Sequence, residues 1–182
     1  MYKFLKSNSI IIAAITLIIL VVGYLFLKET PVKTVKNYLA LHYTVTANDC
    51  DIYNKEKASM ADHMYDNKEI IAQEKSIQNL MTTDAFEKYS MNTSLRETIK
   101  GPALGNFTTE IKNLKVSEGE KSGDDRIFNA SFLWIANDEN GNVKREEKMD
   151  LQLRLSEENG KWKINNNNQY YYLTKDLIIA WY

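Results

Sequence analysis

Residues 127–164 read IFNASFLWIANDENGNVKREEKMDLQLRLSEENGKWKI, and this stretch decides the fold class of the 182-residue chain. Its first part, Ile127–Ala136, places aromatic side chains on one face of a strand, namely those of Phe128, Phe132 and Trp134. Its middle part, from Met149 to Leu155, alternates apolar residues with charged or amide residues. A period of two is the pattern of a strand with one buried face and one wet face. The stretch therefore predicts antiparallel sheet.

Two Asn-Gly pairs divide this stretch. Asn140-Gly141 and Asn159-Gly160 each predict a two-residue hairpin turn. The last strand, Lys161–Ile164, would then turn Trp162 and Ile164 inward.

A further strand is expected before this stretch, over Phe107–Val116, with the polar residues Glu118–Asp125 as the turn that follows it. Ile111 and Leu114 fall on opposite faces of that strand unless a bulge near Asn113 intervenes. The sequence thus predicts a meander of three or four antiparallel strands.

Helical periodicity occupies the region before the strands. Pro31 suits a first helical position after a Thr30 cap, and an apolar stripe predicts a helix to about Asn48; the stripe consists of Val35, Tyr38, Leu39, His42 and Tyr43. Capping boxes at Asp66–Glu69 and Thr83–Glu87 predict two more helices. Gly101-Pro102 and Gly105 predict a loop. Helices followed by strands, without alternation, indicate an α+β fold.

An apolar segment precedes these elements. Ile10–Leu27 contains no charged residue and is long enough to span the hydrocarbon core of a bilayer as a helix. A cleaved secretory signal is disfavoured because no small-residue cleavage site follows, and a lipoprotein signal because the only cysteine is Cys50. A buried core helix would need a polar stripe, which this segment lacks.

We therefore expect a short cytoplasmic tail over residues 1–9, a transmembrane signal anchor over residues 10–28, and an extracytoplasmic domain over residues 29–182. The anchor is marked by Ile10, Ile15, Leu20 and Leu27. Lys3 and Lys6 precede the span, so the positive-inside rule places the N-terminus in the cytoplasm.

Composition argues against several classes of function. One cysteine and two histidines offer no metal site of multiple Cys or His ligands, and no glycine-rich phosphate loop is present. A net charge of −1 argues against direct nucleic-acid binding. His42 lies on an apolar stripe and is expected in the core. Cys50 lies between Asp49 and Asp51, which raise a thiol pKa, and it is expected to be unreactive. We expect no cofactor, no metal and no catalytic residues.

Two groups of aromatic residues are candidates for function. The first could line an interior pocket or form the core between helix and sheet, and consists of Tyr38, Tyr43, Phe128, Phe132, Trp134 and Trp162. The second is a candidate protein interface near the C-terminus, where a final strand or a short helix is expected, and consists of Tyr170, Tyr171, Tyr172, Trp181 and Tyr182.

The element order resembles the NTF2-like superfamily. The resemblance covers about Pro31 to Ile164 and includes the bulge-like break near Asn113, the Asn-Gly hairpins, and the string Gly160–Ile164 (GKWKI), where many such domains end a strand with G-x-W-x-I/V. It implies a cone in which N-terminal helices pack on a curved antiparallel sheet. Enzymes of the superfamily use an Asp, His or Tyr inside an apolar cavity at the mouth of the cone.

The membrane-anchored layout also resembles the VirB8-like components of bacterial conjugation and type IV secretion systems. The Asn-Pro motif of Gram-negative VirB8 proteins is absent, because the only prolines are Pro31 and Pro102. The resemblance therefore points to the divergent Gram-positive members. It implies a single-pass protein of the cell membrane whose candidate partners are other envelope or secretion-channel proteins and further copies of itself.

Three functions follow as hypotheses. The first is a non-enzymatic assembly or scaffold component of a conjugation or secretion channel, in which the sheet face and the C-terminal aromatics make the contacts. The second is an anchored extracytoplasmic domain that binds a lipid or small molecule in its cone. The third is an envelope immunity or stress protein. They rest on fold-level analogy.

Overall fold

A computed structural model describes residues 30–58, 68–92 and 95–165. The expected tail and anchor, and the aromatic residues of 170–182, lie outside these residues. Within the described residues, five helices are followed by four strands: α2 (Pro31–Tyr43), α3 (Ala47–Ala58), α4 (Lys68–Leu80), α5 (Thr83–Asn92), α6 (Leu95–Gly105), β1 (Phe107–Ser122), β2 (Asp125–Asp138), β3 (Val143–Glu158) and β4 (Lys161–Ile164). This confirms the α+β class. Within the described ranges, no helix is both long and apolar enough to cross a membrane.

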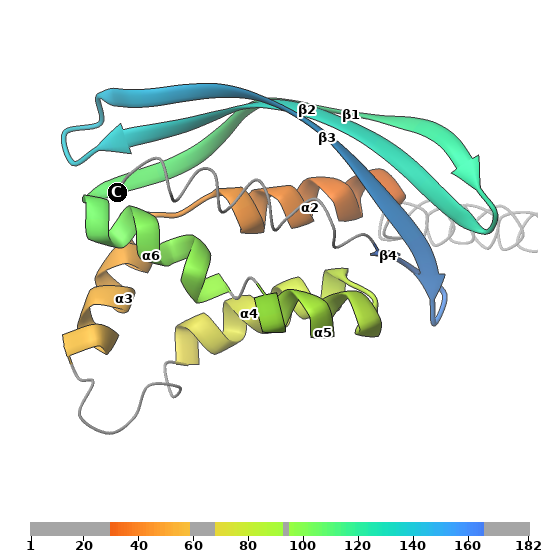
Figure 1. Ribbon diagram of the computed structural model, residues 1–182, viewed down its shortest axis with the longest axis horizontal. Helices are drawn as coiled ribbons and strands as arrows, with labels where there is room; N and C mark the ends of the chain where they lie inside the picture. The colour runs from red at the N-terminus through yellow and green to blue at the C-terminus, as the bar shows by residue number, and fades with distance from the viewer. Residues whose placement is uncertain (1–29, 59–67, 93–94, 166–182) are drawn as a thin grey trace, which may run out of the picture. The chain divides into compact units, whose positions relative to one another are not determined.

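The strands form one antiparallel sheet in the order β1-β2-β3-β4. Within the compact unit Pro31–Tyr182, the described helices gather on one face of the sheet, and the strands arch over α2 (Figure 1). α2 packs against β1, β2 and β4 on one side and against α4 and α6 on the other. The sheet thus has an inner face toward the helices and an outer face away from them.

α2 carries the buried stripe that its sequence predicts. Each residue of the stripe is at most 5% exposed. They join a continuous core with the inner-face residues of β2 and β3, which are Phe128, Ala130, Phe132, Trp134, Ala136, Met149, Leu151, Leu153 and Leu155. Burial of such side chains, at about 25 cal/mol per Å² of apolar surface, is the main force that holds helix to sheet.

The bulge in β1 is confirmed. The pairing register with β2 shifts between Lys112 and Lys115, and Asn113 adopts a left-handed φ of 56°. The extra residue turns the strand so that Ile111 and Leu114 both pack against the core.

The hairpin predictions have mixed outcomes. Asn159-Gly160 is a two-residue turn with φ values of 54° and 73°, as expected. Asn140-Gly141 lies in the hairpin between β2 and β3, as expected, but the expected two-residue turn is wrong, because the loop spans 139–142 and only Gly141 in it has a positive φ. The Asp138 carboxylate explains the longer loop, since its Oδ1 accepts the backbone N–H groups of Asn140 and Asn142, each at 2.9 Å.

The turn expected over Glu118–Asp125 is also shorter than predicted. Ser122 pairs with Asp125, so only Gly123 and Asp124 form the turn. Polar residues before it continue β1, because a strand whose outer side is wet tolerates them.

The first helix ends earlier than the predicted Asn48. Its last residue is Tyr43, and Val45 then pairs with Thr109 of β1 through two backbone hydrogen bonds of 3.1 and 2.9 Å. A capping box that the sequence analysis missed starts α3: Asp49 Oδ2 accepts the Thr46 N–H at 2.7 Å, and Thr46 Oγ1 accepts the Asp49 N–H at 3.2 Å.

The loop predicted at Gly101-Pro102 and Gly105 is wrong as well. α6 runs through Pro102 to Gly105. Leu95, Ile99 and Ala103 on its inner side are each at most 3% exposed, so core packing outweighs the hydrogen bond lost at the proline.

Candidate functional site

The interior aromatic residues divide into two locations. Tyr38, Phe128, Phe132 and Trp134 lie in the core between α2 and the sheet, each at most 5% exposed. Trp162 lies at the edge of this core: it is half-buried on β4 and packs against the core residues, its ring is 4.6 Å from the Arg126 guanidinium carbon, and its carbonyl accepts the Thr34 hydroxyl at 3.2 Å. The structure therefore does not bring all the candidate residues to one pocket.

His42 is the centre of the interior cluster. Its ring centroid lies 5.7 Å from that of Tyr38, 4.9 Å from that of Tyr43 and 5.8 Å from that of Tyr89. Tyr43 in turn touches Phe132 of β2, with ring centroids 5.1 Å apart. Tyrosine rings from α2 and α5 thus contact the imidazole, and Tyr43 links this cluster to the sheet.

Burial controls the chemistry of this cluster. Desolvation lowers the pKa of His42 to about 4, so the imidazole is neutral at neutral pH. Desolvation also raises the pKa values of the Tyr43 and Tyr89 phenols, which therefore stay protonated. Among the described residues, neither Tyr43 Oη nor Tyr89 Oη has a hydrogen-bond partner. The His42, Tyr43 and Tyr89 side chains are therefore uncharged at neutral pH, and the charge of Glu74 adds to the rise in the pKa of Tyr89.

Cys50 has the raised thiol pKa that its acidic neighbours predicted. Desolvation is the largest cause, followed by the Asp49 and Asp51 charges, and together they raise the pKa to about 11. The thiolate is therefore scarce at neutral pH. Over the described ranges, no three His, Cys, Asp or Glu side chains lie together in a way that could hold a metal ion.

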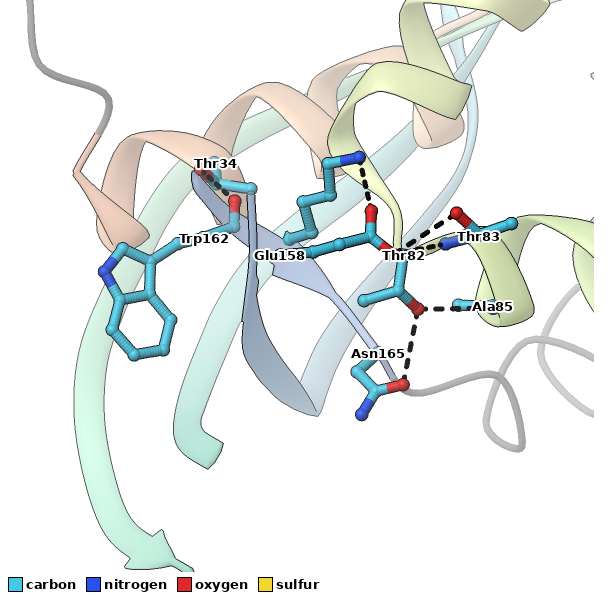
Figure 2. Close-up of polar contacts among 8 residues, drawn as sticks. Thr34, Thr82, Thr83, Ala85, Glu158, Trp162 and Asn165 are labelled. Atoms are coloured by element: carbon cyan, nitrogen blue, oxygen red, sulfur yellow. Dashed lines mark hydrogen bonds and ion pairs between the residues drawn. The ribbon is translucent and has the colours of Figure 1, made fainter. Parts of the chain in front are cut away.

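A second cluster joins the end of the sheet to the helices (Figure 2). Thr82 Oγ1 accepts the Ala85 N–H and donates to Asn165 Oδ1, at 3.2 and 3.3 Å. Glu158 Oε1 accepts from the backbone N–H and the hydroxyl of Thr83, and Glu158 Oε2 pairs with Lys163 Nζ at 2.7 Å. These contacts hold the Gly160–Ile164 string against the start of α5, which is a structural role.

The outer face of the sheet is the third location. Register places three rows of side chains there across β1, β2 and β3: Glu110–Ile135–Glu146, Lys112–Leu133–Lys148 and Lys115–Ser131–Asp150. Next to the third row along the strands, Ser117, Asn129 and Gln152 form a fourth, polar row. The third and fourth rows line a shallow hollow of about 490 Å³. No described helix packs on this side (Figure 1).

The charged rows were not singled out from the sequence. Their signal was present as charges two residues apart on predicted strands, in Glu110 and Lys112 and again in Glu146 and Lys148. Residues two apart on a strand share a face, so the pattern was available once the strands were assigned.

Comparison with known proteins gives no relative to transfer a role from: no protein-family model, curated protein or solved structure matches the chain.

Proposed function

We propose that this chain is a non-enzymatic, membrane-anchored assembly component of a bacterial conjugation or type IV secretion channel, similar in role to VirB8-like proteins. The observation that carries the proposal is the outer face of the sheet. Three long strands present it, charged side chains cover it, and no described helix occupies it. A broad charged surface of this kind can recognise partner proteins through electrostatic complementarity.

The apolar segment Ile10–Leu27 supports the same role. It ends a few residues before Pro31, where the compact unit begins. An anchor in the cell membrane with a cytoplasmic N-terminus would hold the domain beside other envelope proteins and raise its effective concentration toward them. The aromatic residues of 170–182 would add a second contact.

The test is genetic and biochemical. Deletion of the gene is expected to abolish DNA transfer or secretion, and the full chain supplied in trans is expected to restore it. Crosslinking in intact membranes should capture a secretion ATPase, a channel protein or a cell-wall hydrolase on the domain. The proposal fails if deletion leaves transfer and secretion intact while neighbouring components of the channel are required.

A second candidate function is the binding of a lipid or small molecule inside the domain. The Tyr43 and Tyr89 hydroxyl groups favour it, because both are buried and neither has a partner among the described residues. Native mass spectrometry of the full chain after gentle extraction is expected to show a copurifying molecule in this case. A spectrum with the protein mass alone, together with Tyr43→Phe and Tyr89→Phe variants that keep full function, rejects it.

A further inference from the structure

The charged rows of the outer face have a self-complementary order. Glu110 and Glu146 flank Ile135 in one row, and Lys112 and Lys148 flank Leu133 in the next row along the strands. Each row therefore carries the same charge at both ends and an apolar residue in the middle. Ile135 is buried and Leu133 half-buried in the single chain, so the apolar centre lies low and the exposed charged side chains stand around it.

We propose that this face binds a second copy of the chain, related by a two-fold axis that crosses the strands at right angles between these two rows. That axis places the Lys112–Leu133–Lys148 row of one copy against the Glu110–Ile135–Glu146 row of the other. Each lysine then faces a glutamate, which gives four opposite-charge pairs around Leu133 and Ile135 of both copies. The contact is isologous, because the same patch serves both copies.

The alternative axis, parallel to the strands along β2, is excluded by charge. It would place Lys112 against Lys148 and Glu110 against Glu146. Like charges that face each other across an interface cost several kcal/mol. Only the crossing axis makes the pattern attractive, so the arrangement of charges defines the geometry of the pair as well as its existence.

The existing ion pairs within the chain do not prevent this exchange. Glu110 pairs with Lys112 and Lys148 pairs with Asp150, each at 2.9 Å, and all four side chains are 39% to 71% exposed. Exposed pairs of this kind contribute little and can rearrange. In the paired state Lys112 and Lys148 gain a glutamate of the other copy in a site from which water is partly removed, where the attraction is stronger.

This inference deepens the proposed function by naming a second copy of the chain as the partner of the outer face. It shares with the proposed function one premise, that this face is a contact surface. The two fail separately. Loss of DNA transfer on deletion says nothing about pairing of copies, and pairing is measured on the purified chain without any secretion assay.

The experiment uses the full chain in detergent and measures its mass by sedimentation velocity. The wild-type chain is expected to be a dimer. One variant, K112E/K148E, makes both rows acidic, and a second, E110K/E146K, makes both rows basic. Each alone is expected to dimerise at least about 100-fold more weakly, because every facing pair becomes repulsive.

Mixing the two variants is the decisive measurement. In a mixed pair all four contacts again join opposite charges. An equimolar mixture is therefore expected to recover dimers, each of which contains one acidic and one basic variant. The control variant K36E/K75E makes the same change in net charge on exposed helical positions and is expected to dimerise as the wild type does. Thermal unfolding of each variant establishes that it is folded.

Three results overturn the proposal. They are a monomeric wild-type chain, variants that remain dimeric on their own, and a mixture of folded variants that stays monomeric. The second result would assign the pairing to another part of the chain, such as the apolar segment.

Discussion

At the residue scale, His42 is a buried titratable group whose imidazole is desolvated. A neutral imidazole is packed among three tyrosine rings on the stripe of α2. The sequence predicted its burial, because the 3,4 spacing places it on the apolar side of the helix. The sequence did not predict that Tyr89 would complete the cluster, because α5 and α2 meet only through tertiary packing.

The buried histidine predicts a pH dependence of stability. Its pKa is about 4 in the folded chain, against an ordinary value of 6.5 for an exposed histidine, so the unfolded chain binds the proton more tightly between these values. The contribution of the neutral His42 to the free energy of unfolding is therefore fully present above about pH 6.5. It is lost as the pH drops toward 4, and the loss is about 2–3 kcal/mol at pH 4.5.

Urea unfolding measures this contribution. Between pH 7 and pH 4.5 the wild type is expected to lose about 2–3 kcal/mol more of its free energy of unfolding than His42→Phe does, because the variant has no imidazole to protonate at position 42. Two stability curves that stay parallel over this range would show that His42 is not desolvated.

The two buried phenol hydroxyl groups predict an unusual response to their removal. Neither has a hydrogen-bond partner among the described residues, so Tyr43→Phe and Tyr89→Phe remove a desolvated polar group. Each substitution is expected to leave the free energy of unfolding unchanged or raise it by about 1 kcal/mol. Chemical denaturation measures it. A loss of about 1 kcal/mol or more would instead reveal a hydrogen bond to water or to a residue beyond the described ranges.

At the element scale, the bulge in β1 decides which side chains reach the core. The sequence showed the conflict between Ile111 and Leu114, and a bulge was the one device that resolved it. The boundaries of other elements were harder to predict, because they depend on distant partners. The end of α2 is decided by pairing of Val45 with Thr109, and the passage of α6 through Pro102 by burial of Ile99 and Ala103.

The left-handed backbone of Asn113 predicts a strong preference at that position. Asn113→Val is expected to lower the free energy of unfolding by about 1–2 kcal/mol, because a β-branched side chain clashes at positive φ. Asn113→Gly is expected to be close to neutral. Ser117→Val, on the exposed side of the same strand, is the matched control and should cost nothing. Equal stability of Asn113→Val and Ser117→Val would argue against the bulge.

The start of α5 provides a second prediction at this scale. Thr82 is the cap: its Oγ1 accepts the Ala85 N–H and its carbonyl accepts the Phe86 N–H, whereas the sequence placed the start one residue later. Thr82→Ala should lower the midpoint of thermal unfolding by an amount equivalent to about 1 kcal/mol. Thr82→Ser keeps a hydroxyl at the cap and should retain most of that stability. Thr83→Ala removes only the exposed contact with Glu158 and should cost less. The reverse order of the two alanine variants would return the cap to Thr83.

At the scale of the whole molecule, the core residues that the structure describes lie between Val35 and Ile164, with Val32 packed against them. The α+β class was predictable, because it depends on the change of periodicity from 3.6 to 2 along the chain. The outer face was not, because a charged surface acquires its pattern only when register brings three strands together.

Because all these core residues come after Thr30, we predict that the domain folds without the apolar segment. A chain that begins at Thr30 is expected to melt within about 3 °C of the full chain, since 1 kcal/mol corresponds to roughly 2–4 °C for a domain of this size. In cell fractionation the full chain should sediment with membranes and the shortened chain should not. Loss of the cooperative unfolding transition on shortening would show that residues 1–29 contribute to the domain.

The hydrogen bond from Thr34 to the carbonyl of Trp162 joins residues 128 positions apart. Among the described helices α2 is synthesised first, and although α4 and β1 pack against it, its contacts with β4 form only after the last described strand has been made. At roughly 5–20 residues per second, this interval is on the order of 10 s. During that time part of the apolar surface of α2 stays exposed. We therefore expect export and maturation of this chain to depend on a holding chaperone more than those of a domain whose contacts are mostly local in sequence.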